Sequence, residues 1–136
     1  LDIIQAHVSP VVHRAKGGAQ GGTDTPTLFN AVLDRVFKAA ILAWDSEGLQ
    51  SEINNVTISH VVAADDPTFF SDSPAKLARM LEIFARSLWP AGLALQTSKS
   101  AWACNAMARS LASTEDVAAL NHVPDKTEQC LTFLRA

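Results

Sequence analysis

Val61-Val62-Ala63-Ala64-Asp65-Asp66 is the stretch from which we predict the fold of this chain. It joins an apolar run to two adjacent carboxylates, and a second short run, residues 67–70, follows at once. Two such runs around a polar turn predict a β-hairpin with acids at its tip. Neighbouring anions repel each other unless a cation lies between them, and hard oxygen ligands suit Mg²⁺. Asp65 and Asp66 are therefore a candidate metal site.

Composition points to one globular domain. The chain has 136 residues, 48% of them hydrophobic, and a net charge of −3. That charge argues against an autonomous nucleic-acid-binding protein, which would normally carry a basic face. The two cysteines, Cys104 and Cys130, do not form a Cys-x-x-Cys pair. Free thiols in a reducing compartment are therefore favoured over one disulfide.

The sequence also predicts a location and an origin. No apolar run reaches the length of a transmembrane helix, and no basic-then-apolar leader opens the chain. We therefore expect an intracellular protein with no membrane partner, without distinguishing nucleus from cytoplasm. The chain begins at Leu1 rather than at a methionine, which suggests a segment of something longer.

Two long helices are predicted from their termini and their apolar stripes. Thr25 is a good N-cap, Pro26 fits the first helical position, and Gly48 can end the helix in a left-handed conformation. A second helix has Ser73 as its cap and Pro74 as its first residue, and Pro90 and Gly92 end it. In both segments apolar residues recur at steps of three and four, which indicates one buried face per helix.

The strands around these helices are shorter. Val56 to Ala64 is β-branched and apolar and predicts a mostly buried strand. Weaker signals predict an edge strand within residues 1–16, a short helix over 114–120, and strands over 93–95, 102–107 and 131–134. This order predicts an α+β domain in which two main helices pack on one face of an antiparallel sheet.

Three ordered motifs add a resemblance to a known family. They are Lys16–Gly21 with Thr25-Pro26 and Leu28-Phe29-Asn30, then Ala64-Asp65-Asp66 with Ser71–Pro74, then Gly92–Gln96 with Lys99-Ser100. In this order they resemble the palm of reverse transcriptases, nearest to those of non-LTR retrotransposons and group II introns. The resemblance covers residues 14–100, and residues 101–136 would begin the region next to the thumb. The whole chain would then be a partial palm-like domain.

The resemblance implies roles for particular residues. Nucleotidyl transfer uses two Mg²⁺ ions about 3.5–4 Å apart, which clamp the attacking and leaving oxygens. Asp65 would be the principal metal ligand, Asp66 a secondary one, and Lys99 would stabilise the leaving pyrophosphate. Contacts to the RNA template, DNA primer or incoming deoxynucleotide are implied for Arg14, Lys16, Gln20 and Gly21.

The chain also departs from the family pattern. Ala63 stands where the family usually has an aromatic residue, and Pro67 directly follows the acid pair. The family's first palm motif, which supplies another metal-binding aspartate, has no counterpart here, and neither do the fingers. We therefore expect this segment alone to bind Mg²⁺ weakly and not to polymerise. Two alternatives stay open: an inert palm remnant, and an unrelated small soluble binding domain in which the acids form a polar turn and Lys99 is a solvated lysine.

Overall fold

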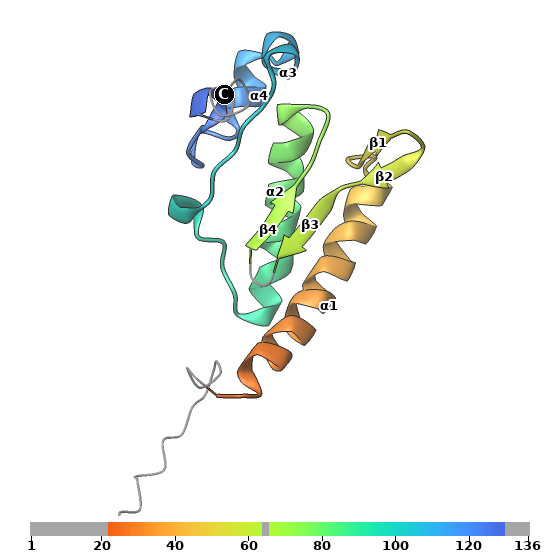
Figure 1. Cartoon of the computed structure of the whole chain (residues 1–136), viewed down its shortest axis with the longest axis vertical. Helices are drawn as coiled ribbons and strands as arrows, with labels where there is room; N and C mark the ends of the chain where they lie inside the picture. Colours follow the sequence, from red (N-terminus) through yellow and green to blue (C-terminus); the bar gives the residue numbers. More distant parts are fainter. Residues whose placement is uncertain (1–21, 64–65, 130–136) are drawn as a thin grey trace, which may run out of the picture.

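The computed structural model describes residues 22–63 and 66–129 as an α+β arrangement (Figure 1). Its elements, in chain order, are α1 (Thr25–Ser46), β1 (Ser51–Ile53), β2 (Val56–Ile58), β3 (His60–Ala63), β4 (Asp66–Phe69), α2 (Pro74–Leu88), the 3₁₀ helices η1 (Trp89–Ala91) and η2 (Thr97–Lys99), α3 (Ala106–Leu111) and α4 (Thr114–Ala118). The α+β class is confirmed. The strands predicted within residues 1–16 and over 131–134 lie outside the described residues.

The first predicted helix is confirmed, and its start is shifted by one residue. Thr25 is the first helical residue rather than the cap, and Asp24 occupies the cap position without a side-chain capping bond. Pro26 stays within the first turn, where a missing N–H costs no intrahelical bond. Gly48 has φ +63°, the left-handed conformation expected of a glycine after a helix.

The second helix follows its sequence signals closely. The Ser73 side chain accepts a hydrogen bond from the Lys76 backbone N–H at 3.3 Å, and Pro74 is the first helical residue. At the other end α2 continues into η1, and Gly92 closes the turn with φ +70°. Local chemistry thus determines both ends of α2.

The single buried strand predicted over Val56–Ala64 is wrong. The chain forms two strands, β2 and β3, interrupted at Ser59, and they belong to different two-stranded antiparallel sheets. β1 pairs with β2 around Asn54-Asn55, whose φ angles of 52° and 63° suit a tight hairpin turn. Val61 is exposed as well, because its side chain lies on the face of the β3–β4 hairpin that is turned away from the helices.

Two further strand predictions are also wrong. Residues 93–95 have no strand partner among the described residues, although Leu93 and Leu95 still pack against the main core. Over 102–107, Trp102 makes an isolated bridge with Asp125, and α3 begins inside the predicted strand. Apolar residues alone do not make a strand when no neighbouring backbone is in reach. The short helix predicted over 114–120 is confirmed as α4, which a capping box at Ser113 begins.

The main core lies between α1, α2 and the β3–β4 hairpin. Trp44 and Met80 are fully buried there, and Phe37 and Phe84 nearly so. Phe69 extends from β4 into this cluster, with its ring centroid 5.3 Å from that of Trp44. The two main helices therefore pack on one face of the hairpin, as expected, but this sheet has two strands within the described residues rather than a broad palm-like array.

A second, smaller core lies on another face of α2. Trp102, Leu120 and Val123 are buried in it. The side chains that α2 contributes are Leu77, Ala78 and Leu81. Helix α2 consequently carries two apolar faces and joins the hairpin core to the segment after residue 100.

Candidate functional site

Asp66, one of the two predicted metal ligands, lies on the open face of the hairpin. It is the first residue of β4 and pairs with Ala63. Side chains alternate along a strand, so Asp66 faces the same side as Thr68, away from Phe69 and the helices. Asp66, Thr68 and Val61 are all exposed. A metal-binding carboxylate at this position is open to a ligand approaching from outside.

Pro67 costs the hairpin no hydrogen bond. The Phe70 N–H donates to the Ser59 carbonyl at 2.9 Å, which fixes the pattern of the ladder. Bonded pairs alternate with unbonded pairs in an antiparallel ladder, so the pair Val62↔Pro67 exchanges no bonds. Pro67 therefore removes no donor from the β3–β4 ladder, since its nitrogen points to the outer edge of β4.

The other predicted site residues fall in different parts of the chain. Lys99 is the last residue of η2, on the side of the hairpin away from α1, and it is exposed (Figure 1). Within residues 22–63 and 66–129, neither Lys99 nor Asp66 has an ion-pair partner. The remaining predicted residues, namely Asp65, Arg14, Lys16, Gln20 and Gly21, lie outside the described residues.

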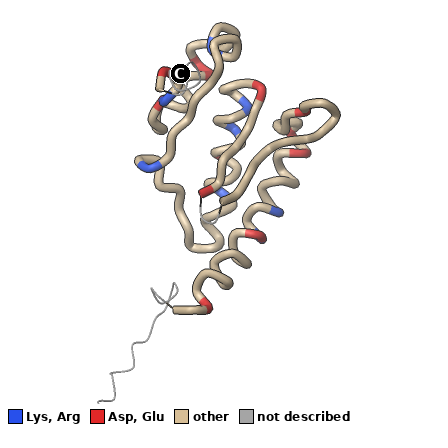
Figure 2. Tube along the Cα trace, viewed as in Figure 1, with Lys and Arg blue, Asp and Glu red and all other residues tan. Residues whose placement is uncertain are grey.

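Positive charge in the described part of the chain is dispersed. Figure 2 shows lysines and arginines on α1, on α2, on η2 and beyond it, interspersed with acidic residues. Several of these cations are already paired, including Lys38 with Asp34 and Arg79 with Glu47. Any electrostatic attraction of nucleic acid by this part of the chain is therefore local rather than spread over a basic face.

The His60 side chain contacts the aromatic core under the hairpin. Its ring stacks on Phe37 with centroids 4.9 Å apart, and its Nδ1 lies 2.9 Å from the Ser59 hydroxyl oxygen. Burial lowers the pKa of His60 below its ordinary value of 6.5, because the charged ring is poorly solvated there. These contacts make His60 a hydrogen-bonded residue that packs against the core.

This lowered pKa predicts a pH-dependent stability. The unfolded chain binds a proton at His60 more readily than the folded chain does, so stability is complete above about pH 6.5 and decreases as pH falls below it. We expect the urea midpoint to fall between pH 7.5 and 5.5. In His60→Phe, which keeps an aromatic ring on Phe37, the fall should be smaller. Equal pH dependence in both proteins would contradict this assignment.

An ion-pair network ties the end of α1 to α2. Arg79 donates two hydrogen bonds to Glu47, both at 2.7 Å, and one to Glu82, also at 2.7 Å. Hydrogen bonds from Arg79 are the main reason that the pKa values of both glutamates are lowered. Since each charge is satisfied by another within the network, this cluster holds the two helices together and lacks a free acid or base for catalysis.

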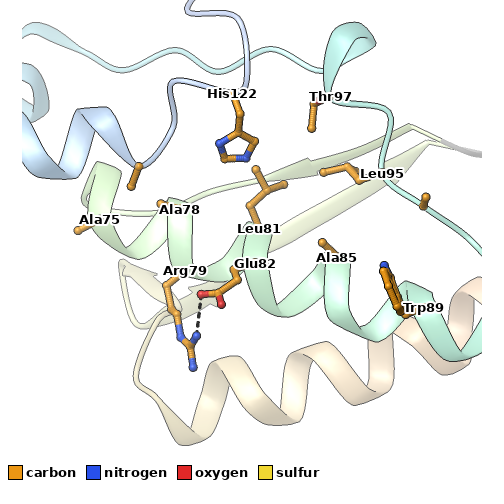
Figure 3. A pocket seen from close by; sticks show the side chains of 12 residues that line it. Ala75, Ala78, Arg79, Leu81, Glu82, Ala85, Trp89, Leu95, Thr97 and His122 are labelled. Atoms are coloured by element: carbon orange, nitrogen blue, oxygen red, sulfur yellow. Dashed lines mark hydrogen bonds and ion pairs between the residues drawn. The ribbon is translucent and has the colours of Figure 1, made fainter.

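A shallow, mostly apolar groove lies along α2 next to this ion-pair network, and Arg79 and Glu82 are among its lining residues (Figure 3). It measures about 640 Å³ and runs between α2, residues 94–97 and His122. Half of the α2 side chains that line it are small, Ala75, Ala78 and Ala85, and Trp89 lies at one end. We did not predict this groove from the sequence, although the alanine spacing on α2 was an available signal. Trp89 is 80% exposed.

The described residues alone do not complete a metal centre. In the ranges 22–63 and 66–129, no cluster of three or more histidine, cysteine or acidic side chains is placed to hold a metal ion. The predicted Mg²⁺ site needs Asp65, so it extends beyond this part of the chain. None of the described helices is both long and apolar enough to cross a membrane.

Comparisons with known proteins add no relative. No protein-family model, curated protein or solved structure matches this chain.

Proposed function

We propose that this chain is a palm segment of an RNA-directed DNA polymerase of a mobile element. The observation that carries the proposal is the ordered set of motifs, from Lys16–Gly21 through Asp65-Asp66 to Lys99. A single motif of this kind is weak, and the order with its spacing is more specific. The exposed position of Asp66 on the uncovered face of the hairpin is compatible with such a role.

The proposed chemistry divides among a few residues. Asp65 and Asp66 would hold Mg²⁺, which supplies charge neutralisation for the attacking and leaving oxygens. Lys99 would stabilise the departing pyrophosphate by its positive charge. Gln20 and Gly21 would lie along the template–primer, where a glycine lets the backbone approach closely. The remaining aspartate, the fingers and the thumb would come from other parts of the polymerase.

The proposal predicts weak metal binding that depends on the hairpin acids. Titration with Mg²⁺, followed by calorimetry or by amide chemical shifts, should give a dissociation constant on the order of millimolar, because one or two carboxylates make a sparse site. Asp65→Asn should weaken binding at least about tenfold, since a charged ligand is lost. Asp72→Asn is the matched control, because Asp72 pairs with Lys76 at 3.0 Å on the exposed start of α2.

Three observations separate the alternatives. Nucleotide incorporation by the 136-residue chain alone would contradict the expectation that the catalytic set is incomplete. A reading frame that extends upstream to a Phe-x-x-x-Asp motif would support the polymerase, whereas stop codons or frameshifts there would favour an inert remnant. Equal Mg²⁺ affinity in Asp65→Asn and the unmodified chain would leave the unrelated binding domain as the better interpretation.

A further inference from the structure

Cys104 is a half-buried thiol that lies between the second core and Thr127. Its side chain packs against the cluster that contains Trp102 and Leu120. The Cys104 Sγ lies 3.9 Å from the Thr127 hydroxyl oxygen, and the Cys104 backbone N–H donates to the same oxygen at 3.2 Å. Thr127 is buried, so this contact is enclosed by the protein. The structure therefore holds the thiol in one place, directly beside Thr127.

Backbone hydrogen bonds join the segment around this cysteine to the segment around Thr127. The Trp102 N–H donates to the Pro124 carbonyl at 3.0 Å, and the Lys126 N–H donates to the Trp102 carbonyl at 2.8 Å. These bonds form an isolated parallel bridge between two stretches that are far apart in the sequence. Residues 102–104 and 124–127 consequently form one frame, and the chain continues from that frame into residue 128.

The other cysteine of the chain follows this frame at once. Residues 127–129 are helical, and the Asp125 carboxylate accepts the Thr127 N–H at 2.9 Å where they begin. Cys130 lies just outside the described residues, three positions after Thr127. Side chains three positions apart in a helical turn lie on one face, about 5–6 Å apart at Cβ. A disulfide needs Cβ atoms about 3.5–4.5 Å apart, so a thiol at this spacing from Thr127 suits a partner that touches Thr127.

The folded frame favours a bond within one chain. In the unfolded chain, Cys104 and Cys130 are separated by a long loop, and bringing its ends together costs conformational entropy. In the folded chain, the contact between Cys104 and Thr127 has already closed most of that loop. Each thiol is therefore at a higher effective concentration for the other when the second core is folded than when it is not.

We propose that Cys104 and Cys130 form a reversible disulfide that joins the chain after Gln129 to the second core when oxidant rises. The two thiols lose two protons and two electrons, and a small-molecule disulfide such as oxidised glutathione takes them up and becomes two thiols. In a reducing compartment the pair stays reduced. The proposal does not involve Asp65, Asp66 or Mg²⁺, so it can fail or hold independently of the polymerase assignment.

The test equilibrates the whole 136-residue chain with mixtures of reduced and oxidised glutathione. Cys104 and Cys130 fall in different tryptic peptides, 100–109 and 127–135, so mass spectrometry without reduction detects the cross-link directly. The cross-linked fraction at each glutathione ratio gives the effective concentration of the two thiols. We expect this concentration to be at least about tenfold higher in native buffer than in concentrated urea, because only the folded chain holds the frame together.

Two threonine variants test the contact that positions Cys104. Thr127→Val keeps the size of the side chain but removes the hydroxyl that accepts the Cys104 N–H, so the effective concentration should fall by about fivefold with the fold retained by circular dichroism. Thr57→Val, at an exposed position of β2, is the matched control and should behave as the unmodified chain does. In Cys130→Ser, Cys104 should form only a mixed disulfide with glutathione.

Several results would overturn the proposal. Glutathione adducts on both cysteines without a cross-link would show that the two thiols do not meet. Cross-links that join two copies, seen as a doubled mass of the intact protein, would show that the bond is not made within one chain. Equal effective concentrations in native buffer and in urea, or in Thr127→Val and Thr57→Val, would show that the folded frame does not position the pair.

Discussion

Trp44→Ala is expected to lower the free energy of unfolding by about 3–5 kcal/mol, a large part of the stability of a domain of this size. Trp44 is fully buried at the centre of the main core. Its ring lies edge-on to Phe69 and near Phe84, and its indole N–H donates to the Met80 carbonyl at 3.1 Å. The substitution therefore opens a cavity and also removes the indole donor from the Met80 carbonyl, which keeps only its intrahelical hydrogen bond.

A matched substitution isolates burial as the cause. Trp89→Ala removes the same side chain at a position that is 80% exposed, so we expect a change within about 0.5 kcal/mol. Urea denaturation followed by far-ultraviolet circular dichroism suits both variants, because the signal does not depend on tryptophan. Equal losses in the two variants would show that Trp44 does not anchor the core as the structure places it.

Leu120→Ala should cost about 2–5 kcal/mol through loss of packing in the second core. Leu120 is 1% exposed and lies with Trp102 and Val123 against the second face of α2. Because that cluster is small, the remaining side chains have few ways to close around the cavity. We expect residues 101–129 to loosen from α2 before the main core unfolds.

Hydrogen exchange measured by mass spectrometry distinguishes local loosening from global unfolding. In Leu120→Ala, peptides from 101–129 should lose protection, whereas peptides from α1 should keep most of theirs. Leu111→Ala on α3 is the control, since Leu111 is 80% exposed and its removal should leave exchange nearly unchanged. Equal loss of protection in α1 would mean that both clusters unfold as one unit.

The helices were predictable because their signals are local. Ser73 and Pro74 determine the start of α2 within one turn of chain, and Gly92 determines its end without reference to the rest of the molecule. Even the error at the start of α1 is one residue, where Thr25 and Asp24 compete for the cap position. The spacing of buried positions, at steps of three and four residues, follows from the helical repeat alone.

The strands were less predictable because a strand depends on its neighbours. The apolar run Val56–Ala64 was consistent with a central strand, yet Ser59 divides it between two hairpins. Residues 93–95 have the composition of a strand and no described partner, so their leucines pack without forming a ladder. Pairing over long separations in sequence is not encoded in local composition.

The candidate site was predictable in kind and not in arrangement. The hairpin around Asp65-Asp66 was expected from its two apolar runs, and β3 and β4 form it. Which residues of the β3–β4 ladder exchange hydrogen bonds depends on the register of the two strands, which composition does not fix. In the register observed, Pro67 needs no donor for the ladder, and the main-chain groups of His60 and Val62 point to the outer edge. The tryptophans also differ in position: Trp44 and Trp102 are buried in the two cores, whereas Trp89 lies past the end of α2 and is exposed.

Helix α2 also limits how this chain can be shortened. A cut after Gly92 would excise the partner of its second apolar face and expose Leu77, Ala78 and Leu81 to solvent. Such a fragment would keep the acidic hairpin but expose a new apolar surface on α2, so we expect it to aggregate. Expression boundaries for this protein should therefore retain residues through Val123, even in experiments that concern the hairpin alone.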